Sequence, residues 1–268
     1  MKVNICVLGS GSSGNCTVIW NEKEALLVDC GKLGDGYIIR QLDKLKIPPD
    51  TLTGILITHG HSDHFDPTAV KIAKYFQIPV YIHEITYQSV RKRYKSAKVL
   101  DQRGLVKHHD EKSFNIGEFF IEPFKAYHSQ GYVGKPFGFS IINSNVKIGY
   151  FTDSGRIDTN IVQALSGSSA AIIETNHEEE LVRSGYRNES NKEWILSDFG
   201  HLSNKCAAEL IGRIAQPEHP LRYVFLAHIS KDHNTIDRAL AQVSRSLNSG
   251  KIKLLPTYHD KPSNVVMI

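Results

Sequence analysis

The sequence predicts a mixed chain of class α/β (α+β), and three observations lead to this prediction. Short β-rich runs separated by tight turns fill the first third, and strand and helix patterns then alternate to the end. The second half repeats the theme of the first, and no linker rich in proline, glycine or serine separates regions of different composition. We therefore expect one domain over residues 1–268, made of two similar halves.

The composition excludes several classes of protein. The 268 residues are 41% hydrophobic and 22% charged, which excludes disorder, collagen and coiled coil. Lysine and arginine number 32 against 28 acidic residues, a mild basic bias that is compatible with polyanions. No segment approaches the roughly 20 apolar residues of a membrane span, so we expect no membrane partner. Four cysteines without CxxC spacing favour a reducing compartment, and the cytoplasm is the expected location.

The first half is expected to begin with an antiparallel meander. Its β-rich runs cover residues 3–8, 16–20 and 25–28, and the last run ends at Asp29. A helical pattern over 37–45 ends at two prolines, and an apolar strand over 54–58 follows. Pro67 suits the first turn of a helix over 67–76. A strand over 80–83, a helix over 85–93 and a hairpin over 114–124 complete this half.

The second half is expected to contain a hairpin, two further strands and three helices. The hairpin pairs 137–142 with 147–151, and the buried strands cover 170–173 and 221–227. The helices are expected over 158–165, 205–215 and 235–247. Between them, residues 176–200 are polar and rich in glutamate, and we expect an irregular loop of functional importance there.

A glycine-rich segment near the start matches a dinucleotide-binding pattern. Residues 9–14 read Gly-Ser-Gly-Ser-Ser-Gly after a strand, as G-x-G-x-x-G does. Dinucleotide binding through this pattern needs a helix N-terminus that faces the pyrophosphate. The residues after the glycine-rich segment, 16–20, are β-branched and aromatic and favour a strand instead. The sequence therefore indicates a turn between strands, whose backbone is left as a further candidate for substrate contact.

Residues 59–64, His-Gly-His-Ser-Asp-His, place three imidazoles and a carboxylate directly after an apolar strand. His59 and His61 lie two residues apart, so in extended backbone they point the same way and can share a metal. Asp63 and His64 follow the turn and face a second position, which makes a two-metal site economical. Further ligands are expected just after other strands, and three residues meet this condition: His128, Asp153 and His228.

The order of Asp29, HGHSDH, His128, Asp153 and His228 resembles the metallo-β-lactamase superfamily over nearly the whole chain. This resemblance implies a four-layer αββα sandwich with two divalent metal ions, Zn²⁺ or Mn²⁺ or Fe. It also implies that Asp29 orients the histidine loop, that Asp63 can accept the proton of the attacking water, and that Asp153 bridges the metals. The implied ligands are His59, His61 and His128 for one metal, and Asp63, His64 and His228 for the other.

Two features indicate which branch of the superfamily the chain resembles. The superfamily's phosphodiesterases, thioesterases and lactonases carry an aspartate at the position of Asp153, where β-lactamases proper carry a cysteine. Gly200-His201-Leu202-Ser203-Asn204 resembles a tRNase Z motif, which implies that His201 pairs with Glu174 and protonates the leaving group. The plain alternative is a helix cap formed by Ser203 or Asn204.

The YycJ-like (WalJ-like) branch shares more of these motifs, namely SGSSGN, THxHSDH, Glu-x-Asn-His at 174–177 and GHLSN. This resemblance implies a DNA exonuclease or a related phosphodiesterase. We expect Ser203, Asn204 and His177 to contact the substrate. The sequence departs from the branch at 186–190, which reads Tyr-Arg-Asn-Glu-Ser where the branch is rich in tyrosine and proline.

The sequence thus predicts a binuclear metallohydrolase that acts on phosphodiester bonds of nucleic acid or a nucleotide. The alternatives are a phosphodiesterase for small cyclic nucleotides, a thioesterase or lactonase, and a binding protein without turnover. A basic cluster over 91–98, with Tyr87 and Tyr94, is expected to track a phosphate backbone or else to be a solvated face. The metal, the choice of DNA or RNA, the polarity of attack and the formation of a homodimer are left open by the sequence.

Overall fold

The computed structural model describes residues 2–129, 131–215, 221–247 and 252–268. The chain divides into two compact units. Unit 1 comprises Met1–Glu122, Gln130–Pro136 and Tyr258–Ile268, and unit 2 comprises Pro123–Ser129 and Phe137–Thr257. Each unit has its own buried apolar cluster. The expectation of a single domain stays a prediction.

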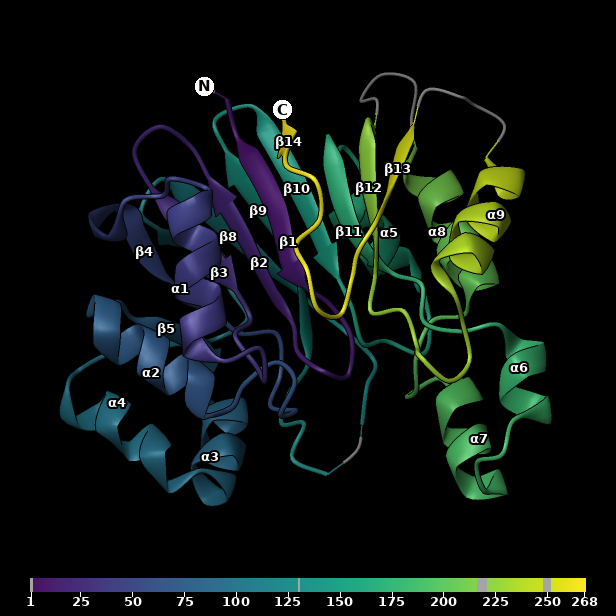
Figure 1. Ribbon diagram of the computed structural model, residues 1–268, viewed down its shortest axis with the longest axis horizontal. Helices are drawn as coiled ribbons and strands as arrows, with labels where there is room; N and C mark the ends of the chain where they lie inside the picture. The colour runs from purple at the N-terminus through teal and green to yellow at the C-terminus, as the bar shows by residue number, and fades with distance from the viewer. Residues whose placement is uncertain (1, 130, 216–220, 248–251) are drawn as a thin grey trace. The chain divides into compact units, whose positions relative to one another are not determined.

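The first sheet has the strand order β14-β1-β2-β3-β4-β5-β6 (Figure 1). The meander expected at the start is confirmed, because β1, β2 and β3 pair antiparallel, whereas β3 to β6 pair in parallel. The strands are β1 (Asn4–Gly9), β2 (Cys16–Trp20), β3 (Ala25–Val28), β4 (Leu52–Leu56), β5 (Val80–His83), β6 (Val106–His109) and β14 (Val266–Met267).

The helices of unit 1 are α1 (Asp35–Lys44), α2 (Pro67–Phe76), α3 (Glu84–Arg93) and α4 (Lys98–Gln102), with short 3₁₀ turns at Pro49–Thr51 and Lys95–Ala97. Helix α2 has the bounds that the sequence predicts. The Asp66 side chain caps its N-terminus by accepting a hydrogen bond from the Thr68 N–H (2.7 Å), and Pro67 occupies the first turn. Helix α2 packs against both α1 and β4.

The second sheet has the strand order β13-β12-β11-β10-β9-β8-β7. Strands β10 to β13 pair in parallel, and β9 pairs antiparallel with β10. Strand β11 is buried at every position, as expected of a parallel strand inside a sheet. The strands are β7 (Phe114–Ile116), β8 (Phe119–Lys125), β9 (Phe137–Asn143), β10 (Val146–Phe151), β11 (Ala170–Glu174), β12 (Tyr223–Ala227) and β13 (Lys253–Pro256).

Helix α8 of unit 2 packs against α5 and α9 and contributes to the apolar core. The helices of this unit are α5 (Thr159–Leu165), α6 (Glu179–Ser184), α7 (Glu189–Leu196), α8 (Asn204–Ile214) and α9 (Ile236–Ser246). None of the helices in the described part of the chain has the length and apolar character that crossing a membrane would need.

The expectation of an irregular loop over 176–200 is wrong, because this segment contains α6 and α7. Asn188 caps α7, since its Oδ1 accepts a hydrogen bond from the Asn191 N–H at 2.9 Å. The sequence analysis also missed α4, β6, β13 and β14. These elements are short, and exposed polar side chains in β6 hide its strand pattern. The expected strand 221–227 is shorter at its start, where β12 begins at Tyr223.

The predicted turn at residues 9–14 is confirmed, since it joins β1 to β2 and no helix follows it. Gly11 and Gly14 have φ values of 132° and 138°, which favour glycine. A Cβ at Gly14 would lie 2.5 Å from the Gly31 carbonyl oxygen, so the turn packs closely on the chain after β3. The dinucleotide-binding alternative lacks its helix.

Candidate functional site

The histidine loop of unit 1 follows β4 and brings its ring nitrogens close together. His59 Nε2 lies 3.1 Å from His61 Nδ1, so these two residues share one side of the loop, as their spacing predicts. The chain turns immediately afterwards, because the His61 carbonyl accepts hydrogen bonds from the N–H groups of His64 (3.0 Å) and Phe65 (2.8 Å). The His59 and His64 rings lie with their centroids 4.1 Å apart.

A buried carboxylate fixes the orientation of this loop. Asp29 follows β3, and its Oδ2 lies 2.8 Å from His64 Nδ1. Its Oδ1 accepts a hydrogen bond from the Thr58 N–H at 2.9 Å. Burial raises the pKa of the Asp29 carboxyl, an effect that His64 and Thr58 oppose. Since Nδ1 of His64 faces Asp29, the tautomer with its lone pair on Nε2 is favoured, and that atom can bind a metal.

Asn15, at the end of the glycine-rich turn, contacts the same loop. Its Nδ2 lies 3.1 Å from His64 Nε2 and 3.3 Å from Asp63 Oδ2. Its Oδ1 accepts a hydrogen bond from the Gly11 N–H at 2.8 Å, and its own N–H donates to the Asp63 carbonyl at 2.8 Å. The side chain is 1% exposed. The turn therefore supports the histidine loop through both the side-chain amide and the backbone N–H of Asn15.

In unit 2, the residues expected at the strand ends form a buried cluster. Asp153 Oδ1 lies 3.5 Å from His228 Nε2, 3.6 Å from His201 Nδ1 and 3.8 Å from His128 Nε2. His128 Nδ1 lies 2.8 Å from the Gly200 carbonyl oxygen, which accepts its proton and leaves Nε2 as the lone-pair atom. Asp153 follows β10, His228 follows β12, and His128 lies three residues past β8.

Backbone strain marks several of these strand ends. Asp29, Asp153 and His228 have φ values of 57°, 58° and 53°, in the left-handed region that non-glycine residues rarely adopt. Each such residue costs on the order of 1 kcal/mol, and strain of this kind gathers at functional sites because the surrounding structure holds a side chain in one direction.

Glu174 and His201 are paired, as the sequence predicts. Glu174 ends β11 and is fully buried; its Oε1 lies 2.7 Å from His201 Nδ1 and 3.3 Å from His228 Nδ1. Its Oε2 accepts hydrogen bonds from the N–H groups of Ser154 (3.0 Å) and Leu202 (3.2 Å). Burial alone would raise the pKa of the Glu174 carboxyl, but the facing His201 and His228 imidazoles lower it to about 2.

The donor atoms of unit 2 suit a divalent metal ion. One ligand atom each of Asp153, Glu174, His201 and His228 lie within 4.8 Å of one another. Imidazole nitrogens and carboxylate oxygens in such a group suit zinc, manganese or iron. The four cysteines are all free, and none of them belongs to this group. The donor atoms of this group therefore fit a bound metal ion, and Asp153 and His228, two ligands that the sequence predicts, are among them.

The expected substrate contacts are largely buried. Burial and the nearby His201 charge lower the pKa of His177 to about 4, and its side chain is 1% exposed. Asn204 is fully buried, and its Nδ2 donates to Glu178 Oε1 at 2.7 Å. Ser203 caps α8 by accepting a hydrogen bond from the Cys206 N–H at 3.2 Å. Ser203 is thus a helix cap, as the alternative in the sequence analysis expects. The substrate roles of Ser203, Asn204 and His177 stay predictions.

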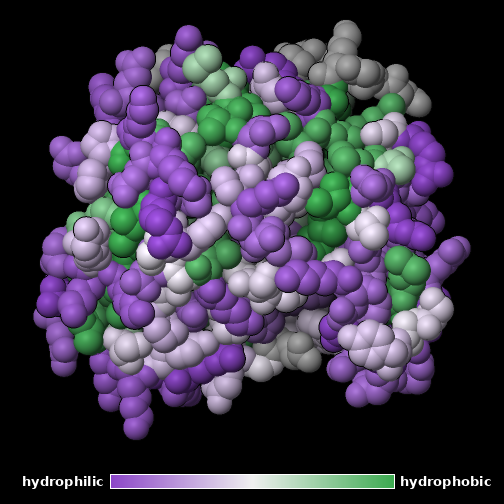
Figure 2. Space-filling model, in the orientation of Figure 1, coloured by the Kyte–Doolittle hydropathy of each residue, from purple (hydrophilic) through white to green (hydrophobic). Residues whose placement is uncertain are grey.

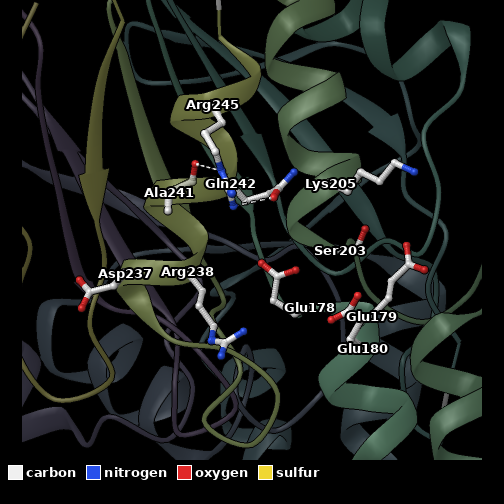
Figure 3. A pocket seen from close by; sticks show the side chains of 10 residues that line it. All are labelled: Glu178, Glu179, Glu180, Ser203, Lys205, Asp237, Arg238, Ala241, Gln242 and Arg245. Carbon is white, nitrogen blue, oxygen red and sulfur yellow. Dashed lines mark hydrogen bonds between the residues drawn. The ribbon is translucent and has the colours of Figure 1, made fainter.

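A cavity of about 620 Å³ lies between α6, α8 and α9 (Figure 3). Ser203 is the one expected site residue on its wall. In Figure 3, Arg238 and Arg245 extend from α9, and the side chains of Glu179 and Glu180 lie across from them. The wall therefore carries charges of both signs, and none of Asp153, Glu174, His201 and His228 lines it.

Sequence reasoning missed two supporting residues of unit 2. The Trp194 indole N–H donates to the Ser129 carbonyl at 2.9 Å, and its ring centroid lies 5.6 Å from that of His128 and 5.3 Å from that of His201. Asn176 Nδ2 donates to the His228 carbonyl at 2.9 Å. The Glu-x-Asn-His match was a signal for Asn176, whereas nothing local signalled Trp194.

Comparisons with known proteins agree with this geometry. The family model of the beta-lactamase superfamily domain matches residues 25–237. Exodeoxyribonuclease YycJ of Bacillus anthracis is 32% identical over 249 residues, which cover 92% of this chain and 90% of that protein. The metallo-beta-lactamase fold protein YhfI from Bacillus subtilis has a TM-score of 0.72 at 14% identity, with all of both chains covered. Human tRNase Z, short form, has a TM-score of 0.60 at 20% identity, covering 85% of this chain and 93% of that one.

Two mixed sheets with flanking helices, together with clusters of imidazoles and carboxylates, define a hydrolase with metal-binding groups. The chain belongs to the beta-lactamase superfamily domain family. The fold class predicted from the sequence, that of the metallo-β-lactamase proteins, is confirmed by the family match and by the likeness to solved structures. The predicted likeness to the YycJ-like exonucleases is confirmed as well.

Proposed function

We propose that this protein is a metal-dependent phosphodiesterase that degrades nucleic acid from an end, as an exonuclease does. The observation that carries the proposal is the Glu174–His201 pair beside Asp153, because this pair can serve a leaving oxygen. The 32% identity to a protein named exodeoxyribonuclease, over 92% of this chain, supports the choice of substrate. We propose DNA as the first substrate to test.

The proposed ligands are those that the family resemblance implies: His59, His61 and His128 for one metal, Asp63, His64 and His228 for the other, and Asp153 between them. Two bound divalent ions would lower the pKa of a water and stabilise charge on the phosphoryl oxygens. Zn²⁺ or Mn²⁺ fits this nitrogen and oxygen donor set, and so does iron. The two units then act as one hydrolase domain, a reading supported by the family match, which runs through both. We place the protein in the cytoplasm.

The chain's own residues divide the remaining work. Asp63 accepts the proton of the attacking water. Glu174 stays ionised, because its pKa is about 2, and holds the Nδ1–H of His201 at 2.7 Å. The Nε2 of His201 has no hydrogen-bond partner in the described ranges, and the side chain is 12% exposed, so this atom can pass a proton to the leaving oxygen. His128 and His228 each keep the proton on Nδ1, because the Gly200 carbonyl oxygen faces that atom in His128 and the Glu174 carboxylate faces it in His228.

The test is hydrolysis of bis(p-nitrophenyl) phosphate by metal-stripped protein reloaded with Mn²⁺ or Zn²⁺. We expect turnover that needs the metal. On a dithymidine phosphodiester, whose leaving oxygen needs a proton, we expect a kcat about 10²- to 10⁴-fold lower in His201→Ala. His108→Ala is the matched control, since this histidine of β6 lies in unit 1 and bonds to the Ile82 carbonyl oxygen. Absence of turnover with both metals would overturn the proposal. A thioesterase or lactonase would hydrolyse its ester with little loss in His201→Ala.

A further inference from the structure

Helix α3 ends in a strongly basic segment. Arg91, Lys92 and Arg93 form its last turn, and Lys95 and Lys98 follow directly; all five are exposed (Figure 2 shows mostly hydrophilic side chains over this part of unit 1). Arg91 lies 3.4 Å from Asp101, whereas the other four have no ion pair within the ranges that the structure describes. Over residues 91–103, Asp101 is the single acidic residue.

This segment borders a groove of about 420 Å³. The groove is lined by Gln88, Arg91, Lys92 and Lys98, so three of its four wall residues are cationic. Such a groove suits a chain of phosphates better than a neutral ligand, since each cation can neutralise one phosphate and release a counterion.

The segment is also attached to the histidine loop within unit 1. A Cβ at Gly60 would lie 3.1 Å from Val90 Cγ1 of α3 and 2.4 Å from the Tyr132 carbonyl oxygen, so both α3 and Tyr132 pack against the loop. Burial raises the pKa of the Tyr94 hydroxyl, and Ser62 of the loop partly opposes this effect, so the two side chains are neighbours. The basic end of α3 therefore lies directly beside the residues proposed to bind metal.

Aromatic rings accompany the cations. The Arg93 guanidinium carbon lies 5.6 Å from the ring centroid of Tyr132 and 5.3 Å from that of Tyr94. Tyr132 is 47% exposed, so part of its ring is available to a ligand. Tyr87, which the sequence analysis grouped with these residues, is buried and donates to the Ala97 carbonyl at 2.9 Å. Tyr87 therefore supports α3 and offers no ring to a partner.

We propose that this α3 basic surface, made of Arg91, Lys92, Arg93, Lys95, Lys98 and Tyr132, binds a single strand of nucleic acid that leads to the catalytic site. The phosphates lie in the groove between Lys92 and Lys98, and an unpaired base stacks on Tyr132. An exposed ring favours a single strand over a duplex, because the faces of paired bases are already covered. The inference rests on the proposed function and specifies its substrate as a strand rather than a small cyclic nucleotide.

The test compares two double variants that each remove two positive charges. Lys92→Gln with Lys98→Gln alters the groove; Lys44→Gln with Lys74→Gln is the control, because these exposed lysines occupy the last turns of α1 and α2, as Lys92 does in α3. Binding of a 5′-fluorescein-labelled 20-nucleotide oligothymidine is followed by anisotropy on metal-stripped protein at several salt concentrations. We expect a Kd about tenfold higher for the groove variant, and a salt slope smaller by about 0.7 per lost contact.

Equal Kd values and equal salt slopes for the two double variants would refute the inference. A second comparison tests the base contact: Tyr132→Leu should raise the Kd for the single strand about tenfold, and Tyr132→Phe should restore it. If Tyr132→Leu weakened a 20-base-pair duplex by the same factor, the choice of a single strand would be wrong.

Hydrolysis of bis(p-nitrophenyl) phosphate by the unaltered chain separates this inference from the proposed function, because that diester has neither bases nor a phosphate chain. If the unaltered chain hydrolyses this diester and the two double variants bind the strand equally, the α3 basic surface is refuted and the proposed function stands. A chain that does not hydrolyse it, yet loses strand binding in the groove variant, refutes the proposed reaction and supports the surface.

Discussion

Asn15→Ala tests whether the glycine-rich turn supports the metal-binding loop. The Asn15 amide nitrogen lies 3.3 Å from Asp63 Oδ2 and 3.1 Å from His64 Nε2. The amide also holds its own turn, since Oδ1 accepts from the Gly11 N–H and Nδ2 donates to the Gly11 carbonyl at 3.1 Å. The alanine variant removes the side-chain contacts to both proposed ligands at once and keeps the backbone hydrogen bond to the Asp63 carbonyl.

The expected loss follows from the hydrogen bond to the Asp63 carboxylate. A hydrogen bond to a charged group contributes about 1.5–3 kcal/mol, and removal of a group that orients a ligand typically costs about 10- to 100-fold in metal affinity or activity. We therefore expect Asn15→Ala to weaken Zn²⁺ binding by about 10- to 100-fold, with a similar loss of kcat/KM at low metal concentration.

The assay is competition for Zn²⁺ with a chromophoric chelator, run beside Ser13→Ala. Ser13 belongs to the same turn but is exposed, and its Oγ lies 3.2 Å from His259 Nδ1 instead of the histidine loop. A merely structural role would lower the thermal midpoint of Asn15→Ala and leave the zinc affinity of the folded protein unchanged. A zinc Kd within twofold of that of Ser13→Ala would refute the reasoning.

Two further predictions concern buried titratable groups. Burial, with a smaller effect of His83, lowers the pKa of His109 to about 4 from about 6.5. The unfolded chain binds this proton first as the pH falls, so the free energy of unfolding should drop by about 2 kcal/mol from pH 6.5 to 5. His109→Phe keeps the stacked contact with Phe114, so its free energy of unfolding, measured in urea, should drop by about 2 kcal/mol less over the same pH range. An equal drop in both proteins would show that another group causes it. Glu174→Gln should lower kcat for a phosphodiester about 10- to 100-fold and shift its pH profile, and an unchanged profile would contradict the pairing of Glu174 with His201.

The sequence predicted those parts of the site that are local in the chain or fixed by a strand end. His59 and His61 share a direction because alternate residues of an extended segment do, and Asp153 and His228 lie together because neighbouring parallel strands end at one edge of a sheet. The contact of Asn15 with Asp63 spans 48 residues, and no periodicity could reveal it. The Glu174–His201 contact also spans distant residues, and only the family resemblance supplied it.

The main error of the sequence analysis was the loop expected over residues 176–200, where composition and helix-start signals point to different structures. Residues 176–200 are polar and short of apolar periodicity, which predicts a loop. Glutamates nevertheless occupy the first turns of both α6 and α7, and Asn188 caps α7. Trp194 of α7 is then held by the Ser129 carbonyl and packs near His128, a contact that is tertiary and leaves no local pattern. Burial of His177 and Asn204 has the same origin, because both bond to neighbours outside their own segment.

The central claim is that metal ions and the buried carboxylate of Asp153 together serve the cleavage of a nucleic acid strand. The most direct measurement is degradation of a linear DNA strand carrying a fluorescent label at one end, by metal-stripped protein with and without added Mn²⁺, beside Asp153→Asn. We predict mononucleotides released progressively from one end only when the metal is added, and at least about 10²-fold slower release by Asp153→Asn. Degradation that is independent of metal, or equal in the Asp153→Asn variant, would contradict the account.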